Sequence, residues 1–364
     1  TRTFNENILI YISPKFRVCQ YIFYKKAEKI AINKVIAARR RMKMMSGFQI
    51  RTDLALEAKE NCEAEHETIR GVKVEEQENR EAEIYTTIVT IETENGARAM
   101  GKPVGTYITL EAPNMSSPDA GYHREISEEL ARHLKDLIGA EKLCDKRILV
   151  VGLGNREVTP DALGPDVVGN LNITRHMIRV YGRISEELQQ AGVISAIVPG
   201  VMAQTGMETV EIIRGVVEET KPELVLVIDA LAARSTKRLN RTIQITDTGI
   251  NPGSGVGNHR NAINQQELGV PVIAIGVPTV VDAATIVNDT MEELIREMEK
   301  MDEMRQLSGA LHALDQAEKH EMIRELIAPN LNTMFVTPKD IDETVKYLSY
   351  TISEGLNLVF CGKI

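Results

Sequence analysis

Four short apolar runs, separated by segments with helical spacing, constrain the fold of this chain more than any other feature of its sequence. The runs are rich in Val and Ile and have the length of strands that are buried on both faces. Helical patterns lie at 207–219 and 283–298, between and after the runs. Strands that alternate with helices form a mostly parallel sheet covered by helices on both faces, so we predict an α/β fold. The four runs are 148–153, 195–201, 224–228 and 271–277.

The segment before these runs has a different pattern. Residues 83–93 and 105–113 are β-branched and alternating, and Asn95-Gly96 between them is typical of a turn, so we expect an additional N-terminal β-hairpin. Other segments are expected to be a helix at 119–139, a short strand or helix start at 335–338, and a helix at 340–348.

Composition excludes several classes of function. The net charge of -9 argues against direct nucleic acid binding, and the absence of Trp argues against a base-stacking surface. The four Cys are far apart and form no CxxC pair, which favours a reducing compartment and no zinc site. No run of eighteen apolar residues is present, so we expect no membrane span.

The first 47 residues differ from the rest in charge. They carry a net charge of +9, so the remainder carries -18. They lack the apolar core and cleavage site of a secretory signal, although a basic arm that binds an acidic surface is an alternative. We interpret 1–47 as a basic leader. We also hypothesise that it is not translated in the native protein, because adjacent AGG codons within Arg39–Arg41 would form a ribosome-binding site just before Met44.

Binding sites in parallel sheets lie at the carboxyl ends of the strands. The loop at the end of the first run is rich in glycine, so it is the first place to look for a site. Gly152 and Gly154 fit the start of a dinucleotide fingerprint, but Glu157 stands where its third glycine belongs. No Gly-Lys-Ser/Thr follows, so a phosphate-binding loop is also disfavoured. Ser254 lies among glycines, yet Pro252 breaks the frame of a nucleophile elbow. A HExxH zinc motif is absent from the sequence.

Two carboxylates remain as candidates. Asp229 directly follows the apolar run 224–228, and Asp161 lies in the loop after the first run. If these strands are neighbours, both groups reach one crevice, where their repulsion leaves a proton on one of them. Such a pair can serve as general base and general acid on a water molecule. The alternatives are structural: Asp161 would favour the first turn of a helix, and Asp229 would pair with Arg234.

The motifs at these strand ends resemble those of the germination proteases of spore-forming Firmicutes. The resemblance rests on VVGLGN, TPDALGP, SAIVPGVM, IDALAARS, GSGVGN and GVPTVVDA, in similar order and spacing from about residue 50 to about 300, and more thinly beyond. It implies an endopeptidase with the fold of the hydrogenase maturation proteases. It also implies that the enzyme is made as a zymogen and assembles as a homotetramer.

The resemblance assigns roles to particular residues. It implies that Asp161 and Asp229 are the catalytic pair. Residues 52–57, TDLALE, resemble the cleavage motif of the family's substrates, which implies self-cleavage between Asp53 and Leu54. Residues 48–53 would then be the end of a propeptide, and 54–364 a single α/β protease domain. Residues expected to line or support the substrate groove are Gly154, Asn155, Pro199, Gly200, Arg234, Gly253, Ser254 and Gly255.

Substrates and location also follow from the resemblance. It implies degradation of small acid-soluble spore proteins during germination, in the cytoplasm of the developing forespore and the spore core, without a cofactor. Two alternatives stay open: a metal-dependent peptidase in which the same two acids are ligands, and a non-proteolytic phosphate-binding α/β module. The metal alternative would make the bound ion, rather than the acid pair, the activator of water.

Overall fold

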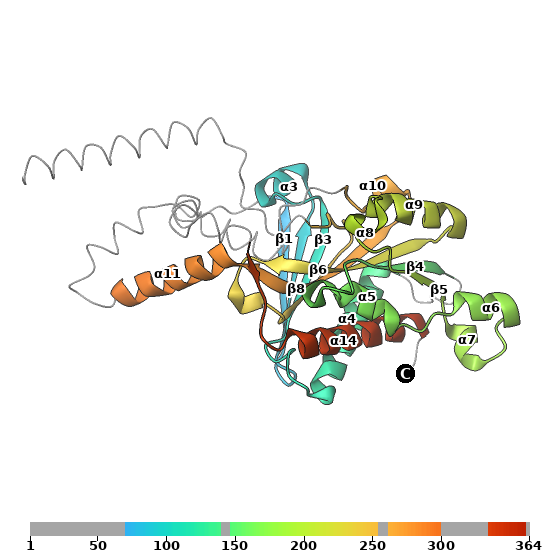
Figure 1. Ribbon diagram of the computed structural model, residues 1–364, viewed down its shortest axis with the longest axis horizontal. Coiled ribbons are helices and arrows are strands. Elements are labelled where there is room, and N and C mark those ends of the chain that lie inside the picture. Colours follow the sequence, from blue (N-terminus) through green and yellow to red (C-terminus); the bar gives the residue numbers. More distant parts are fainter. Residues whose placement is uncertain (1–69, 140–145, 254–260, 300–333, 362–364) are drawn as a thin grey trace, which may run out of the picture. The chain divides into compact units, whose positions relative to one another are not determined.

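The computed structural model describes residues 70–139, 146–253, 261–299 and 334–361. These residues form a nine-stranded sheet with the order β1-β2-β3-β7-β8-β6-β4-β5, in which β9 also pairs with β8 (Figure 1). The four apolar runs form neighbouring parallel strands at one side of the sheet, which confirms the predicted α/β class. They are β4 (Arg147–Gly152), β5 (Val193–Ile197), β6 (Leu224–Ala233) and β8 (Val272–Asp282).

Antiparallel strands extend the sheet on the other side of β8. The predicted pair of N-terminal strands is present as β2 and β3, and two further strands, β1 and β7, flank them. The short β9 pairs antiparallel with the end of β8. These strands are β1 (Val72–Asn79), β2 (Ile84–Ile91), β3 (Gly105–Glu111), β7 (Thr242–Thr246) and β9 (Phe335–Val336).

The predicted turn at Asn95-Gly96 is wrong, because these residues lie in helix α3 (Glu94–Met100). Thr93 caps this helix, and its hydroxyl accepts a hydrogen bond from the Gly96 N–H at 3.1 Å. Met100 packs against a cluster of apolar residues on β2 and β3. A side-chain cap followed by a buried apolar residue therefore turns the connection between β2 and β3 into a helix rather than a tight turn.

Strand β6 is longer than its apolar run indicates. Asp229 was expected to end this strand, but β6 continues to Ala233. The extension is held by β8, with which β6 pairs through Ala233 and Val281, whereas the pairing of β4 with β6 ends at Gly152 and Ile228. Asp229 therefore lies just beyond the point where β4 ends, at a step in the sheet.

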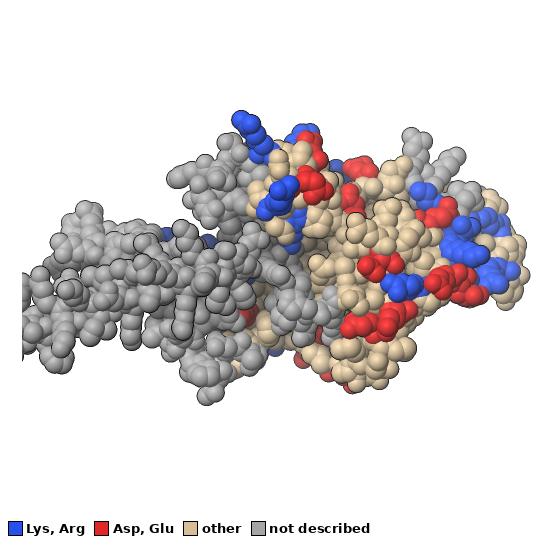
Figure 2. All heavy atoms as spheres, turned by 90° about the horizontal axis from the view of Figure 1, so that it is seen from above, with Lys and Arg blue, Asp and Glu red and all other residues tan. Residues whose placement is uncertain are grey.

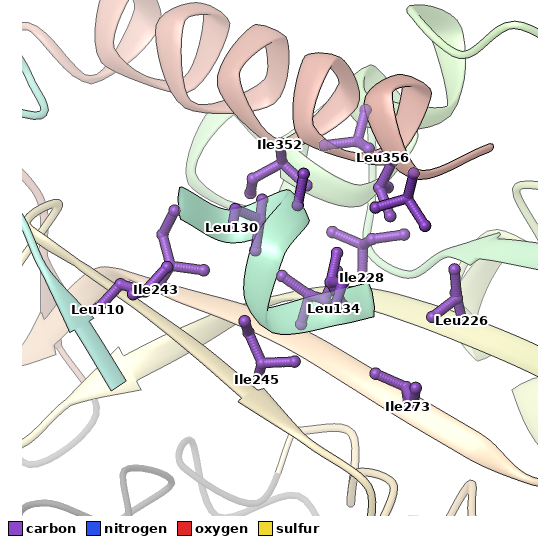
Figure 3. Close-up of a cluster of buried hydrophobic side chains, with 14 of the residues drawn as sticks. Leu110, Leu130, Leu134, Leu226, Ile228, Ile243, Ile245, Ile273, Ile352 and Leu356 are labelled. Atoms are coloured by element: carbon purple, nitrogen blue, oxygen red, sulfur yellow. The ribbon is translucent and has the colours of Figure 1, made fainter. Parts of the chain in front are cut away.

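Helices cover both faces of the parallel strands. On one face, α4 (Ala120–Ile138), α5 (Leu163–Gly169) and α14 (Ile341–Cys361) pack against alternate strand residues. Figure 3 shows Leu130 and Leu134 of α4 between the sheet and Leu356 of α14. On the other face, α9 (Thr209–Thr220) and α10 (Gln265–Leu268) cover the intervening strand residues.

The remaining described helices are short or lie at the margin of the sheet. They include η1 (Thr159–Asp161), which follows β4, and α8 (Met202–Thr205), which follows β5. The segment expected to be helical at 340–348 is the start of α14, which continues to Cys361. The others are α6 (Arg175–Tyr181), α7 (Glu186–Gln190), η2 (Thr236–Arg238) and α11 (Ala283–Glu299).

Candidate active site

A cleft of about 430 Å³ lies at the step in the sheet where β4 ends and β6 continues. Both predicted catalytic residues, Asp161 and Asp229, line it. Its remaining wall comes from the loops after β4, β5 and β7, from the start of α9, from the far ends of β6 and β8, and from β9 and the residue that follows it. The other residues that line it are Leu153, Gly154, Val158, Pro160, Gly200, Val201, Thr209, Ala230, Leu231, Ala232, Asn251, Pro252, Gly253, Thr279, Val280, Phe335 and Thr337.

Asp161 is held by the loop that follows β4. Its backbone N–H donates to the carbonyl of Val158 at 2.8 Å, and its carbonyl accepts from the N–H of Asn155 at 3.0 Å. These bonds close the loop into a compact turn that ends in η1. The side chain of Asp161 is half-buried, so it is open to the cleft while its backbone is fixed.

Two threonines hold the same loop from the opposite side. The hydroxyl of Thr279 on β8 donates to the carbonyl of Pro160 at 2.7 Å, and Thr279 itself is fully buried. The hydroxyl of Thr337 donates to the carbonyl of Thr279 at 2.9 Å. These bonds connect the residue before Asp161 to the sheet and to the segment that leads into α14. Neither threonine was predicted as a site residue from the sequence.

The glycines of this loop allow close packing of the backbone. Gly154 has a φ of 115°, a conformation that other residues rarely adopt. A Cβ on Gly154 would overlap the carbonyl oxygen of Asp161 and lie 3.2 Å from its Oδ1. Gly164 of α5 likewise approaches the backbone of Leu153 and Ile228 too closely for a side chain. Gly154, which fits the nucleotide fingerprint, thus allows the close approach of the Asp161 backbone, and Gly164 allows α5 to pack against β4 and β6.

Asp229 enters the cleft from β6. Asp229 is only 6% exposed, and its Oδ1 accepts a hydrogen bond from the N–H of Ala230 at 3.0 Å. The prediction required the strands that carry the two acids to be neighbours, and β4 and β6 are indeed paired. Two carboxylates in one half-enclosed cleft, bounded mainly by apolar side chains and glycines, can act together on a water molecule and a bound carbonyl group.

The other predicted groove residues fall into three groups. Gly200 and Gly253 line the cleft. Asn155, Pro199 and Arg234 do not line it. Asn155 supports it, however, because its Oδ1 accepts from Gln204 Nε2 of α8 at 3.0 Å and from the N–H of Glu157 at 3.1 Å. The pairing of Arg234 with Asp229 stays a prediction. Asp53, Leu54, Ser254 and Gly255 lie outside the described residues, as do 1–47 and 48–53.

The described residues also bear on metal ions and membranes. In the described ranges, no three His, Cys, Asp or Glu side chains are grouped as a metal site would require. No helix among the described residues has the length and hydropathy of a membrane span. Acidic and basic side chains are interspersed on the face of these residues that is seen in Figure 2.

Comparison with known proteins identifies the family. The model of the family described as "Germination protease" matches residues 50–306 and 296–364. The germination protease of Clostridium perfringens is 46% identical over 313 residues, which cover 85% of this chain and 95% of that protein. The germination protease of Caldanaerobacter subterraneus is 48% identical over 312 residues, or 85% of this chain and 93% of that protein. That of Bacillus pumilus is 39% identical over 359 residues, or 88% and 95%.

Among solved structures, a [NiFe] hydrogenase maturation protease, HycI from Thermococcus kodakarensis, matches 40% of this chain and 80% of that chain. The two are 20% identical with a TM-score of 0.25, a similarity too small to carry an argument. The family model and the sequence relatives, by contrast, extend over most of the chain and over both strand ends that form the cleft. The chain therefore belongs to the germination protease family, so its activity is proteolysis.

Proposed function

We propose that this chain is a self-activating endopeptidase in which Asp161 and Asp229 jointly activate a water molecule. The observation that carries the proposal is that the two aspartates, which are far apart in the sequence, line one cleft at the step between β4 and β6. The resemblance to the family supports small acid-soluble spore proteins as substrates during germination. It also supports a homotetramer and a location in the cytoplasm of the forespore and spore core.

Peptide hydrolysis by this pair needs one ionised and one protonated carboxyl group. The ionised carboxylate removes a proton from water as the water oxygen attacks the scissile carbonyl carbon. The protonated group gives its proton to the carbonyl oxygen, which yields a tetrahedral diol. When the diol collapses, one hydroxyl returns its proton to the second carboxylate, the first carboxyl group protonates the leaving nitrogen, and the C–N bond breaks. Both groups then have their initial protonation states.

Self-activation is part of the same proposal. The segment TDLALE at 52–57 resembles the substrate motif, so the enzyme would cut its own chain between Asp53 and Leu54. The mature enzyme would then comprise 54–364, and the catalytic pair that cuts the propeptide would be the pair that later cuts the substrates.

Mass spectrometry of the purified chain after incubation at mildly acidic pH tests this proposal. The parent is expected to acquire a new N-terminus at Leu54, and Asp161→Asn and Asp229→Asn are expected to remain intact. Asp166→Asn is the matched control, because Asp166 lies on α5 close to the same loop, does not line the cleft, and is 3.8 Å from Arg156. Processing in either catalytic variant at the parent rate would refute the role of that aspartate.

A second arm of the experiment separates the acid pair from the metal-dependent alternative. The parent is dialysed against a chelator and assayed with and without added divalent ions. The acid pair predicts an unchanged rate of processing, because it needs no ion. A rate that is lost on chelation and restored by one metal ion would instead assign Asp161 and Asp229 as ligands.

A further inference from the structure

Within the described part of the chain, the part of β6 beyond Ile228 pairs with a strand on one side only. β8 pairs with it through Ala233, while the pairing with β4 ends at Gly152 and Ile228. Among the described residues, no strand pairs with the extension 229–233 on the side where β4 would continue. The residues Asp229, Ala230, Leu231 and Ala232 of this extension line the candidate active-site cleft. The cleft therefore lies along a strand edge, at the place that a longer β4 would fill.

The direction of the backbone groups on this edge follows from the pairing up to Leu231, because the register between β6 and β8 shifts between Leu231 and Ala232. The carbonyl of Ile228 accepts from the N–H of Leu153 at 2.8 Å, so the polar groups of Ile228 face β4. Backbone groups of alternate residues in a strand face the same side, so those of Ala230 also face the β4 side. The N–H of Ala230 donates to Oδ1 of Asp229 at 3.0 Å. That bond brings the carboxylate of Asp229 to the same edge.

The side chains around the edge suit an extended polypeptide. Ala230 and Ala232 line the cleft with short side chains, and Leu153, Val201 and Phe335 give it apolar walls. Exposed strand edges bind extended peptides through main-chain hydrogen bonds, and neighbouring pockets accept alternate side chains. An added strand would run past Asp229 and bring a backbone carbonyl within reach of both aspartates.

We propose that the substrate binds by strand addition to the edge of β6 at 229–233, in the position that a continuation of β4 would occupy. The proposal rests on the proposed function and adds the mode of substrate recognition. Specificity then depends on an extended main chain and on alternate side chains, so the enzyme would require a substrate segment that is unfolded at the cleavage site.

Backbone substitution in the substrate tests strand addition without altering the edge of β6. The probe is a peptide with the sequence of residues 50–60, IRTDLALEAKE. At successive positions, one N–H is removed either by N-methylation or by replacing the amide with an ester, which removes the donor without adding bulk. Cleavage by the parent and binding to Asp161→Asn, by fluorescence anisotropy, are measured for each peptide.

Strand addition predicts that the sensitive positions alternate. Both replacements should weaken binding about fivefold to tenfold at every second residue near the scissile bond and have little effect at the residues between them. Uniform tolerance, effects without alternation, or failure of the parent peptide to bind would overturn the proposal. The proposed function fails separately, if the peptide is cut equally well by Asp161→Asn or Asp229→Asn.

Discussion

Replacement of Gly154 by Ala is the sharpest test of how the fold positions Asp161. Gly154 has a φ of 115°, and a Cβ there would overlap the carbonyl oxygen of Asp161. The backbone strain alone is expected to cost about 1–3 kcal/mol of folding free energy. The overlap would also move the loop by roughly 1 Å, and a misplacement of that size lowers catalytic rates about 100-fold. We therefore predict a large loss of activity beside a moderate loss of stability.

A second glycine separates strain from displacement. Gly206, after α8, has a φ of 72°, but a Cβ there meets no atom of the described residues within 4 Å. Gly206→Ala should thus lose roughly 1 kcal/mol of stability from the left-handed conformation, with little change in rate. Unfolding in denaturant and kcat/KM on the peptide of residues 50–60 are measured for both variants at a temperature where both are folded. Equal activity of folded Gly154→Ala and Gly206→Ala would refute the reasoning.

Three further predictions concern positioning, pH and packing. Thr279→Val should lower kcat about tenfold with little change in KM and cost about 1–3 kcal/mol of stability, because the Pro160 carbonyl loses the hydroxyl that donates to it at 2.7 Å. Thr279→Ser keeps a hydroxyl and should restore both kcat and stability in the same kinetic and unfolding assays. Burial, aided by the charge of Arg132, lowers the pKa of His133 below its ordinary 6.5 despite the nearby Glu129 and Asp136. The unfolded chain is then protonated first, so stability falls as the pH decreases below about 6.5, and His133→Gln should flatten the unfolding free energy between pH 7 and 5. Gly355→Ala should destabilise by about 1–3 kcal/mol in thermal unfolding, since its Cβ would lie 2.9 Å from Leu130 Cδ2. Gly215→Ala should instead stabilise by about 0.5–1 kcal/mol, because a Cβ there meets no atom of the described residues within 4 Å.

The parallel part of the sheet could be predicted from sequence because strands buried on both faces have continuous apolar runs. All four runs became β4, β5, β6 and β8. The edge strand β1 was missed because its sequence, VKVEEQEN, is mostly polar and exposed, as is common for strands at the edge of a sheet. The helix α3 was mistaken for a turn because the local Asn-Gly signal was weighed without the cap at Thr93 and the buried Met100.

The two acidic residues of the candidate site could be predicted from the sequence, but the contacts that hold them in place could not. Asp229 stands out in the sequence because a charge directly after an apolar run is unusual, and Asp161 because it is an acid in the glycine-rich loop after the first run. The structure places both in one cleft. Thr279, in contrast, acts on Pro160, which is 119 residues away in the chain, and no local pattern signals such a contact. The extension of β6 was likewise hidden, because its second half is held by pairing with β8 rather than by a run of large apolar residues.

The central claim is that Asp161 and Asp229 act as one catalytic unit, and single-turnover cleavage by the two single variants and the double variant tests it most directly. All three would be compared with the parent and with Asp166→Asn, on the peptide of residues 50–60. A joint role predicts a loss of about 1,000-fold or more in each single Asp→Asn variant. The loss in the double variant should be no more than about tenfold greater, because residues that act as a unit are strongly non-additive. Losses that multiply in the double variant, or a single variant within tenfold of the parent, would contradict the account.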